Sequence, residues 1–368
     1  MNDEYYMKRA LELAEKGRGW TNPNPMVGAV IVKEDRIIGE GYHERYGQLH
    51  AERNALKNCT EDPEGATIYV TLEPCCHHGK TPPCTDAIIE SGITKVVVGM
   101  LDVNPIVAGN GVRILEEHGI EVVTGVLEDE CRKLNKIFIK YMTEKLPYVV
   151  MKYAMTSDGK IATVTGESRW ITGESSRENV HRTRHALMGI MVGVGTVLAD
   201  DPMLDCRLPE GGKNPVRIIC DSLLRLPLES RLVSSAKEIE TIIATVSADE
   251  VRIKEYEVRG CKVLRTGSKG GRVDLNDLMK KLGEEGIDSI LLEGGAELNF
   301  SALREQIVDE VHTYIAPKLF GGSAKTPIGG AGIEKIDDAV LLKPLTLRRF
   351  DDDILIESEV IYRVHGNS

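Results

Sequence analysis

The sequence predicts an α/β protein with two domains. Short apolar segments typical of buried strands alternate with helical segments along most of the chain. The length of 368 residues suggests two domains, at ~150 residues for each. Pro147, whose ring cannot continue a helix, closes a helical segment at residues 131–145. We therefore expect the domain boundary near Leu146, with domains at 1–146 and 147–368.

The N-terminal series begins with an amphipathic helix at residues 6–16. Strands are expected at residues 27–32, 68–72, 95–100 and 121–126. Their runs are apolar without polar alternation, which favours parallel strands buried on both faces. The spacing of these runs predicts an α/β sandwich.

The second series also alternates strands with helical segments. Its strands are expected at residues 147–155, 190–195, 216–221, 241–245, 262–266, 289–295, 311–317 and 353–364. A helical pattern lies between most of them, which favours a mostly parallel sheet. No helix separates the long β segments that close the chain, so we expect an antiparallel edge on that sheet.

The composition favours an enzyme that acts on small molecules. The chain carries 46 Lys and Arg against 57 Asp and Glu, and its net charge of -11 argues against broad binding of nucleic acid. No apolar run approaches the ~20 residues of a membrane span, and the N-terminus lacks the pattern of a signal peptide. We expect a cytoplasmic protein in which the eight cysteines form no disulfide framework, and we interpret the clustered ones first as metal ligands or nucleophiles.

A zinc site is the strongest chemical signal in the sequence. His50 and Glu52 form an H-A-E motif, and a Pro-Cys pair at Cys75 and a further Cys84 follow a predicted strand. One imidazole and two thiolates suit a catalytic zinc ion, which leaves its fourth position to water. Glu52 lies where a carboxylate can carry a proton from that water to departing ammonia. This pattern is that of the zinc nucleobase deaminases, so we expect one zinc ion per chain.

Other residues compete for these roles. Eight residues separate Cys75 from Cys84, and Cys76, His77 and His78 lie among them. Adjacent cysteines cannot easily reach one tetrahedral ion, which favours Cys75 over Cys76. The two histidines are expected to face substrate or solvent.

Two glycine-rich junctions are either structural turns or places where a ligand approaches the backbone. A Rossmann site is excluded at the first of them, because Leu198 stands where G-x-G-x-x-G requires glycine. A predicted strand ends at Gly193 and Gly195, and another passes through Gly294 and Gly295 into a helix. The unpaired N–H groups at such a helix start can receive a pyrophosphate.

Seven motifs occur along the chain in this order: TNPNPMVGAVIV, GYHERYGQLHAE, HHGKTPPC, VVMKYAMTSDGKIA, GESRWIT, VGVGTVLADDPMLDCR and LLEGGAEL. Through these motifs the whole chain resembles the bifunctional deaminase-reductase family of riboflavin biosynthesis. The resemblance implies a cytidine-deaminase-like α/β/α sandwich followed by a dihydrofolate-reductase-like α/β domain. It implies zinc-dependent deamination of 2,5-diamino-6-(5-phosphoribosylamino)pyrimidin-4(3H)-one and then NADPH-dependent reduction of the ribosyl group to ribityl. The expected partners are therefore phosphoribosyl pyrimidines, and a homo-oligomer is left open.

The resemblance also implies site residues. In the first domain Asn24 contacts the heterocycle, while His43, Lys80, Asp102 and Asn104 line the phosphoribosyl side. In the second domain the residues expected to meet NADPH are Ala154, Trp170, Thr196, Asp200, Ser222, Gly295, Ala296, Glu297, Leu298, Asn299, Phe300 and Ser301. Those expected to meet substrate are Ser168, Arg184, Leu204, Arg207 and Glu293.

Lys152 is the candidate catalytic residue of the second domain. It interrupts an apolar strand, where a charge needs a partner, so it is either a snorkelling edge residue or a functional one. Three other functions compete with the pair of activities: an RNA-editing adenosine deaminase with an accessory domain, a structural zinc module with a fourth protein ligand, and an enzyme with Cys76 as nucleophile.

Overall fold

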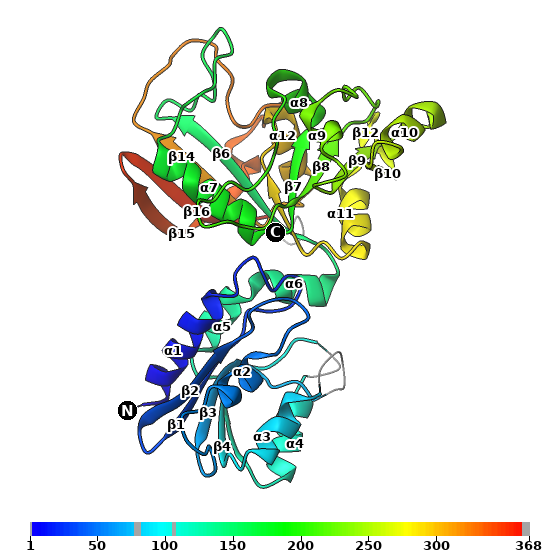
Figure 1. The fold of residues 1–368 in the computed structure, drawn as a ribbon. Helices are drawn as coiled ribbons and strands as arrows, with labels where there is room; N and C mark the ends of the chain where they lie inside the picture. Colours follow the sequence, from blue (N-terminus) through cyan, green and yellow to red (C-terminus); the bar gives the residue numbers. More distant parts are fainter. Residues whose placement is uncertain (1, 77–81, 105–107, 363–368) are drawn as a thin grey trace. The chain divides into compact units, whose positions relative to one another are not determined.

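The computed structural model of the chain describes residues 2–76, 82–104 and 108–362 (Figure 1). The chain divides into two compact units, Met1–Lys145 and Leu146–Ser368. This division falls next to the boundary expected near Leu146. Each unit has its own sheet and its own apolar core.

The described part of the first unit contains a five-stranded sheet in the order β2-β1-β3-β4-β5. The strands are β1 (Gly28–Lys33), β2 (Arg36–Tyr42), β3 (Thr67–Leu72), β4 (Lys95–Met100) and β5 (Glu121–Thr124). The strands β3, β4 and β5 are parallel, as expected. The expectation of parallel strands is wrong for β1, which is antiparallel to both of its neighbours.

The strand β2 was not expected, and the turn that leads into it explains why β1 and β2 are antiparallel. Glu34 and Asp35 join β1 to β2, and both have positive φ, at 54° and 60°. Two successive left-handed residues match the twist of a tight hairpin, but such turns usually contain Gly or Asn. The hairpin therefore lacks the local signal that identifies most turns of this type.

Helices cover both faces of this sheet (Figure 1). They are α1 (Asp3–Glu15), α2 (Ala51–Lys57), α3 (Cys84–Glu90), α4 (Asn110–Glu117), α5 (Glu128–Leu134) and α6 (Lys136–Glu144). The helices α1 and α5 pack together on one face, and α2, α3 and α4 adjoin one another on the other. The helix α2 packs directly on the backbone of β2, because a Cβ at Gly41 would be 2.2 Å from the backbone nitrogen of Ala55. Glycine is required there.

The single helix expected at residues 131–145 is instead two helices that meet at Asn135. The side chain of Asn135 accepts a hydrogen bond from the backbone N–H of Met26 (2.9 Å) and donates one to the Met26 carbonyl (3.0 Å). These bonds tie the junction to the segment before β1. A tertiary contact thus interrupts the helix where the local sequence does not.

The described part of the second unit contains a nine-stranded sheet in the order β10-β9-β8-β7-β13-β6-β14-β16-β15. Its strands are β6 (Tyr148–Thr156), β7 (Gly189–Gly193), β8 (Val216–Cys220), β9 (Thr241–Thr245), β10 (Lys262–Arg265), β13 (Ser289–Leu292), β14 (Glu310–Ala316), β15 (Leu341–Phe350) and β16 (Asp353–Ile361); β11 (Ser268–Lys269) and β12 (Arg272–Val273) form a separate hairpin. The first seven strands in this order, β10 through to β14, are parallel to one another. The last two, β16 and β15, form the expected antiparallel edge. The edge strand β15 itself was not expected, because it is exposed along almost its whole length.

Helices again cover both faces of the large sheet. They are α7 (Glu174–Ala186), α8 (Val194–Asp200), α9 (Arg231–Ser234), α10 (Glu250–Glu257), α11 (Leu275–Glu284) and α12 (Ala296–Arg304), with a 3₁₀ turn at Ile336–Asp338. The helices α11 and α12 pack in one core cluster, and α9 and α10 in another. The helices α8 and α12 follow β7 and β13, which are neighbours in the sheet. None of the helices in the described residues combines the length and hydrophobicity that a membrane span requires.

We expect each unit to fold as an isolated fragment, because each buries its own apolar cluster. A fragment of residues 1–145 and one of residues 146–368 should each unfold cooperatively, as followed by circular dichroism during thermal denaturation. The intact chain is the control. If it folds and neither fragment does, the units are not independent domains.

Candidate active sites

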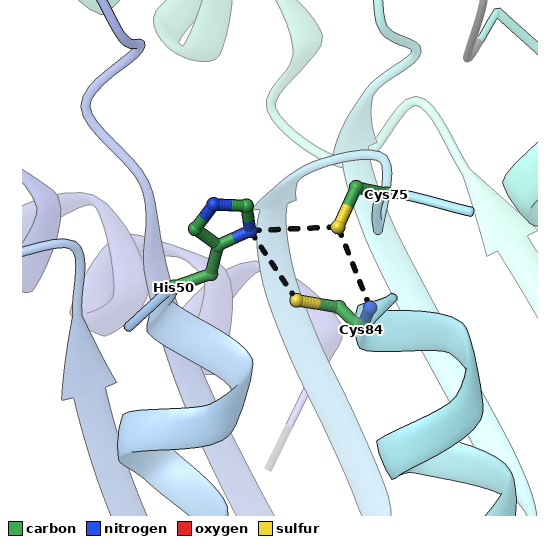
Figure 2. A group of neighbouring side chains, drawn as sticks. All are labelled: His50, Cys75 and Cys84. Atoms are coloured by element: carbon green, nitrogen blue, oxygen red, sulfur yellow. Dashed lines mark hydrogen bonds between the residues drawn. The ribbon is translucent and has the colours of Figure 1, made fainter. Parts of the chain in front are cut away.

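His50, Cys75 and Cys84 come together at one end of the first sheet (Figure 2). His50 immediately precedes α2, Cys75 follows β3, and Cys84 is the first residue of α3. The carbonyl of Cys75 accepts hydrogen bonds from the backbone N–H groups of Cys84 (3.0 Å) and Thr85 (3.2 Å), which ties the two cysteine segments together. Each candidate ligand is thus fixed at the end of a regular element.

The spacing of the three side chains suits zinc. The Nδ1 atom of His50 lies 3.4 Å from the sulfur of Cys75 and 3.4 Å from that of Cys84. In a tetrahedral site with Zn–N of ~2.0 Å and Zn–S of ~2.3 Å, nitrogen and sulfur are about 3.5 Å apart. The donor set and its geometry therefore fit a zinc ion, with three ligands from the described residues.

The two thiols of this group are electrostatically different. A hydrogen bond from Cys84, aided by one from His50, holds the pKa of Cys75 well below its ordinary value. The same contact with Cys75, together with burial, raises the pKa of Cys84. Without metal the pair therefore shares one proton, which a metal ion displaces when it binds both sulfurs.

Glu52 lies on the first turn of α2 with its side chain buried beside these ligands. Burial, together with the charge on Cys75, raises the pKa of Glu52 to about 7. The site thus contains a carboxyl group next to the three candidate ligands, as the H-A-E motif indicates.

His43 and Asn24 adjoin the ligand group. The ring of His43 is buried and lies edge-on to that of His50, with centroids 5.4 Å apart. Its Nδ1 donates to the carbonyl of Leu49 (3.0 Å), so its Nε2 accepts from the Asn24 amide (3.3 Å). Burial lowers the pKa of His43, which keeps the ring neutral and this hydrogen-bond pattern fixed.

The segment that carries Asp102 and Asn104 follows β4. The backbone N–H of Asn104 donates to the Asp102 carboxylate (2.8 Å), and the backbone N–H of Asp102 donates to Glu73 (3.1 Å). Lys80 lies outside the described residues, as do His77 and His78. Glu73 was not identified from the sequence, although a carboxylate between a buried strand and the Pro-Cys pair is itself unusual.

In the second unit, Lys152, Arg184 and Glu293 form one ionic group that is largely buried, with 12–16% of each side chain exposed. The guanidinium of Arg184 binds both oxygens of Glu293, at 2.8 and 3.0 Å, and the Lys152 ammonium lies 3.8 Å from the same carboxylate. Burial would raise the pKa of Glu293, but Arg184 and Lys152 outweigh it and hold that pKa at about 2. Burial lowers the pKa of Lys152, which Glu293 only partly offsets. Lys152 is therefore a largely enclosed residue with a carboxylate partner, and its ammonium does not extend to solvent as a snorkelling lysine does.

Two further residues on α7 extend this group, and neither was identified from the sequence. Asn179 donates to the hydroxyl of Tyr314 (2.6 Å), whose ring faces the ammonium of Lys152. His181 accepts a hydrogen bond from the backbone N–H of Arg207 (3.2 Å). The i, i+3 spacing of His181 and Arg184 on one helix is the signal that could have identified His181.

The other two residues expected to meet substrate, Leu204 and Ser168, differ in burial. Leu204 is buried in the second core cluster of this unit, with φ of 52°. Ser168 lies half-buried in the connection between β6 and α7. Of the expected substrate residues, the structure joins Arg184 and Glu293 directly.

The two glycine-rich junctions lie side by side. A Cβ at Gly295 would be 3.5 Å from the hydroxyl oxygen of Thr196, so the start of α12 adjoins the first turn of α8. Gly295 precedes α12 and lacks a side-chain cap. The N–H groups at this helix start can therefore bind an anion, as the sequence predicts.

The remaining residues expected to meet NADPH differ in what they contact. Ala154 pairs with Tyr314 across β6 and β14, and the exposed ring of Trp170 stacks on Arg177 at 4.5 Å. The carbonyl of Asp200 accepts from Arg169 (3.3 Å), and the hydroxyl of Ser222 accepts from the backbone of Val273 (3.1 Å).

The side chains and carbonyl groups of α12 mostly contact other parts of the second unit. The carbonyl of Ala296 and the carboxylate of Glu297 accept from the backbone of residues 329 and 330, and Asn299 donates to the Pro327 carbonyl. Leu298 and Phe300 pack beneath Gly294 and Gly330, and Ser301 donates to the Glu297 carbonyl. Of this stretch, Gly295 and Ala296 at the helix start are best placed for a cofactor.

Family models and relatives cover nearly the whole chain. A model described as the cytidine and deoxycytidylate deaminase zinc-binding region matches residues 1–100, and one described as the RibD C-terminal domain matches residues 147–356. The chain is 59% identical to the riboflavin biosynthesis protein RibD of Actinobacillus pleuropneumoniae, over 98% of this chain and 96% of that one. It is 42% identical to the Escherichia coli protein of the same name, over 97% of this chain and 99% of that one.

Solved structures agree with the sequence matches. The chain is similar to RibD of Acinetobacter baumannii with a TM-score of 0.88 and 38% identity, over 98% of this chain and 99% of that one. It is similar to a Thermotoga maritima diaminohydroxyphosphoribosylaminopyrimidine deaminase/5-amino-6-(5-phosphoribosylamino)uracil reductase with a TM-score of 0.86 and 42% identity, over the same shares of the two chains.

Proposed function

The chain belongs to the RibD family of riboflavin biosynthesis proteins, and from that premise we propose how its two units carry out the deaminase and reductase reactions. The first unit removes the 2-amino group of the diaminopyrimidine ribotide by hydrolysis. The second reduces the ribosyl group of the product to ribityl. The observation that carries the first assignment is the convergence of His50, Cys75 and Cys84 beside the buried Glu52.

In the proposed deaminase site, His50, Cys75 and Cys84 hold one zinc ion. Zinc, when bound, supplies the Lewis acidity that makes water a nucleophile near neutral pH. Glu52 accepts the proton of the attacking water and delivers it to the leaving amino group, because it is the buried carboxyl beside the ligands. Asn24, oriented by His43, binds the heterocycle, and the segment with Asp102 and Asn104 binds the phosphoribosyl side together with Lys80.

In the proposed reductase site, the starts of α8 and α12 bind NADPH, with Thr196 and Gly295 at their point of contact. NADPH, when bound, supplies a hydride to the anomeric carbon of the ribosyl group. Lys152 donates the proton that accompanies this transfer or stabilises the charge that develops there. Glu293, which Arg184 anchors, holds Lys152 in place. Glu293 and Arg184 also bind the sugar, while Arg207 meets the phosphate.

Two alternatives from the sequence fit less well. An RNA-editing deaminase with an accessory domain does not explain the match of residues 147–356 to the RibD C-terminal domain. A structural zinc module needs a fourth protein ligand, whereas the ligand group in the described residues has three members. The direct test is an assay of the purified chain with the diaminopyrimidine ribotide. Ammonia should be released without NADPH, and NADPH should be consumed only after that release.

We expect Cys84→Ala to remove zinc from the chain, because the two remaining ligands are one fewer than the three that a catalytic zinc site requires. Metal analysis of the purified variant measures this directly, and Cys59→Ala, at a half-buried cysteine outside the group, is the matched control. Undiminished zinc in Cys84→Ala would remove Cys84 from the ligand set and bring Cys76 back as the candidate.

A further inference from the structure

We propose that Glu73 is a positioning residue of the deaminase, which holds the segment carrying Asp102 and Asn104 in the conformation that binds substrate. This inference rests on the proposed function of the first unit. Glu73 binds the backbone of this segment, so it acts through the segment and not on the substrate itself. It has no assigned role in the reaction described above.

The carboxylate of Glu73 is buried and accepts hydrogen bonds from four backbone N–H groups. Its Oε2 accepts from the N–H groups of Asp102 (3.1 Å) and Gly109 (3.0 Å). Its Oε1 accepts from those of Gly111 (2.9 Å) and Val112 (3.2 Å). A carboxylate offers about four acceptor sites, so these donors use its capacity fully.

These donors come from both ends of one connection. Asp102 follows β4, whereas Gly111 and Val112 lie in the first turn of α4. Gly109 is the N-cap of that helix, with φ of 74°, and has no side chain that could cap it. Glu73 therefore supplies the missing cap from a distant part of the sequence and fixes the start and the end of the connection together.

The start of α4, which Glu73 caps, also packs against the turn that carries a proposed zinc ligand. A Cβ at Gly111 would be 2.3 Å from the carbonyl oxygen of Pro74, so the backbones of the two segments are in direct contact. Cys75 is the next residue. The structure thus uses Glu73 to set the substrate-binding segment at a defined place relative to the metal ligands.

The substitution Glu73→Gln tests this role, because an amide has one acceptor oxygen and one donor nitrogen. Two of the backbone N–H groups lose their acceptor and face another donor instead. We expect the binding conformation of the segment to fall to about a tenth of the population, which raises KM for the ribotide about tenfold. We expect kcat of deamination, zinc content and reductase activity to stay within about twofold of the intact chain, because no ligand or reacting group changes. Glu116→Gln, the same change at an exposed position of α4, is the matched control and should leave KM unchanged.

A double-mutant cycle with Asn104→Ala separates a positioning role from a merely structural one. If Glu73 acts through the segment, adding Glu73→Gln to Asn104→Ala raises KM much less than it does alone. If Glu73→Gln yields no zinc-loaded protein, Glu73→Asp takes its place in the same cycle, since it keeps the charge and shortens the reach. An unchanged KM or an additive cycle, in whichever of the two variants loads zinc, overturns the proposal. Because the intact chain is assayed in parallel, failure of the proposed function would appear there as absent ammonia release.

Discussion

Replacement of Glu52 by Gln is expected to lower deaminase turnover by ~10³-fold while the chain keeps its zinc and its reductase activity. The amide preserves the size of the buried side chain on α2, so the ligands His50, Cys75 and Cys84 should stay in place. It cannot accept a proton from water or release one to the leaving amino group. The loss should therefore fall on kcat rather than on KM.

The measurement is ammonia release from the diaminopyrimidine ribotide, with metal analysis of the same sample. Glu90→Gln, at an exposed position of α3, makes the same chemical change away from the site and should retain full turnover. Retained turnover in Glu52→Gln would contradict the assigned role. Loss of zinc would instead show that Glu52 is needed to build the ligand group.

The deaminase site shows which features of a structure can be predicted from short sequence motifs. His50 and Glu52 belong to one short motif at a helix start, and Cys75 belongs to another at a strand end. Each motif fixes its own side chains locally, so the only long-range information needed is that the strand and helix ends meet. The meeting of these side chains at one place could therefore be predicted before the structure, while their roles as ligands and proton carrier stay predictions.

Other features depend on contacts that no local pattern records. Arg184 and Glu293 are 109 residues apart and meet only because β13 pairs with both β6 and β7. The resemblance to known relatives suggested both residues for substrate, but not their bond to each other. Glu73 was missed for the same reason, since its donors lie 29 to 39 residues away in the sequence.

The second large effect is expected at Lys152, where Lys152→Met should lower reductase turnover by ~10²-fold. Methionine keeps most of the volume of the side chain, and Glu293 remains paired with Arg184, so the buried site should survive the change. NADPH affinity and deaminase activity should stay close to those of the intact chain. Single-turnover oxidation of NADPH, followed by absorbance with the deaminated ribotide as substrate, measures the loss.

Lys280→Met, at an exposed position of α11, is the matched control and should have normal turnover. Lys152→Arg keeps the positive charge but cannot release a proton at ordinary pH, because guanidinium titrates above ~12. Turnover that is restored by Arg would therefore show that Lys152 acts by charge alone. Collapse of NADPH affinity in Lys152→Met would instead make Lys152 a cofactor anchor and leave Glu293 as the candidate proton source.

The pH dependence of the reductase provides an independent test of the same residue. A lysine donates a proton only when it is charged, so turnover should fall as pH rises through its pKa. Burial moves the pKa of Lys152 below its ordinary value of 10.5, and the charge of Arg184 acts in the same direction. The alkaline decline should therefore begin at lower pH than an exposed lysine would allow. It should be missing from the residual turnover of Lys152→Met, because that side chain has no proton to lose. An alkaline decline that persists unchanged in the variant would assign the titration to another group.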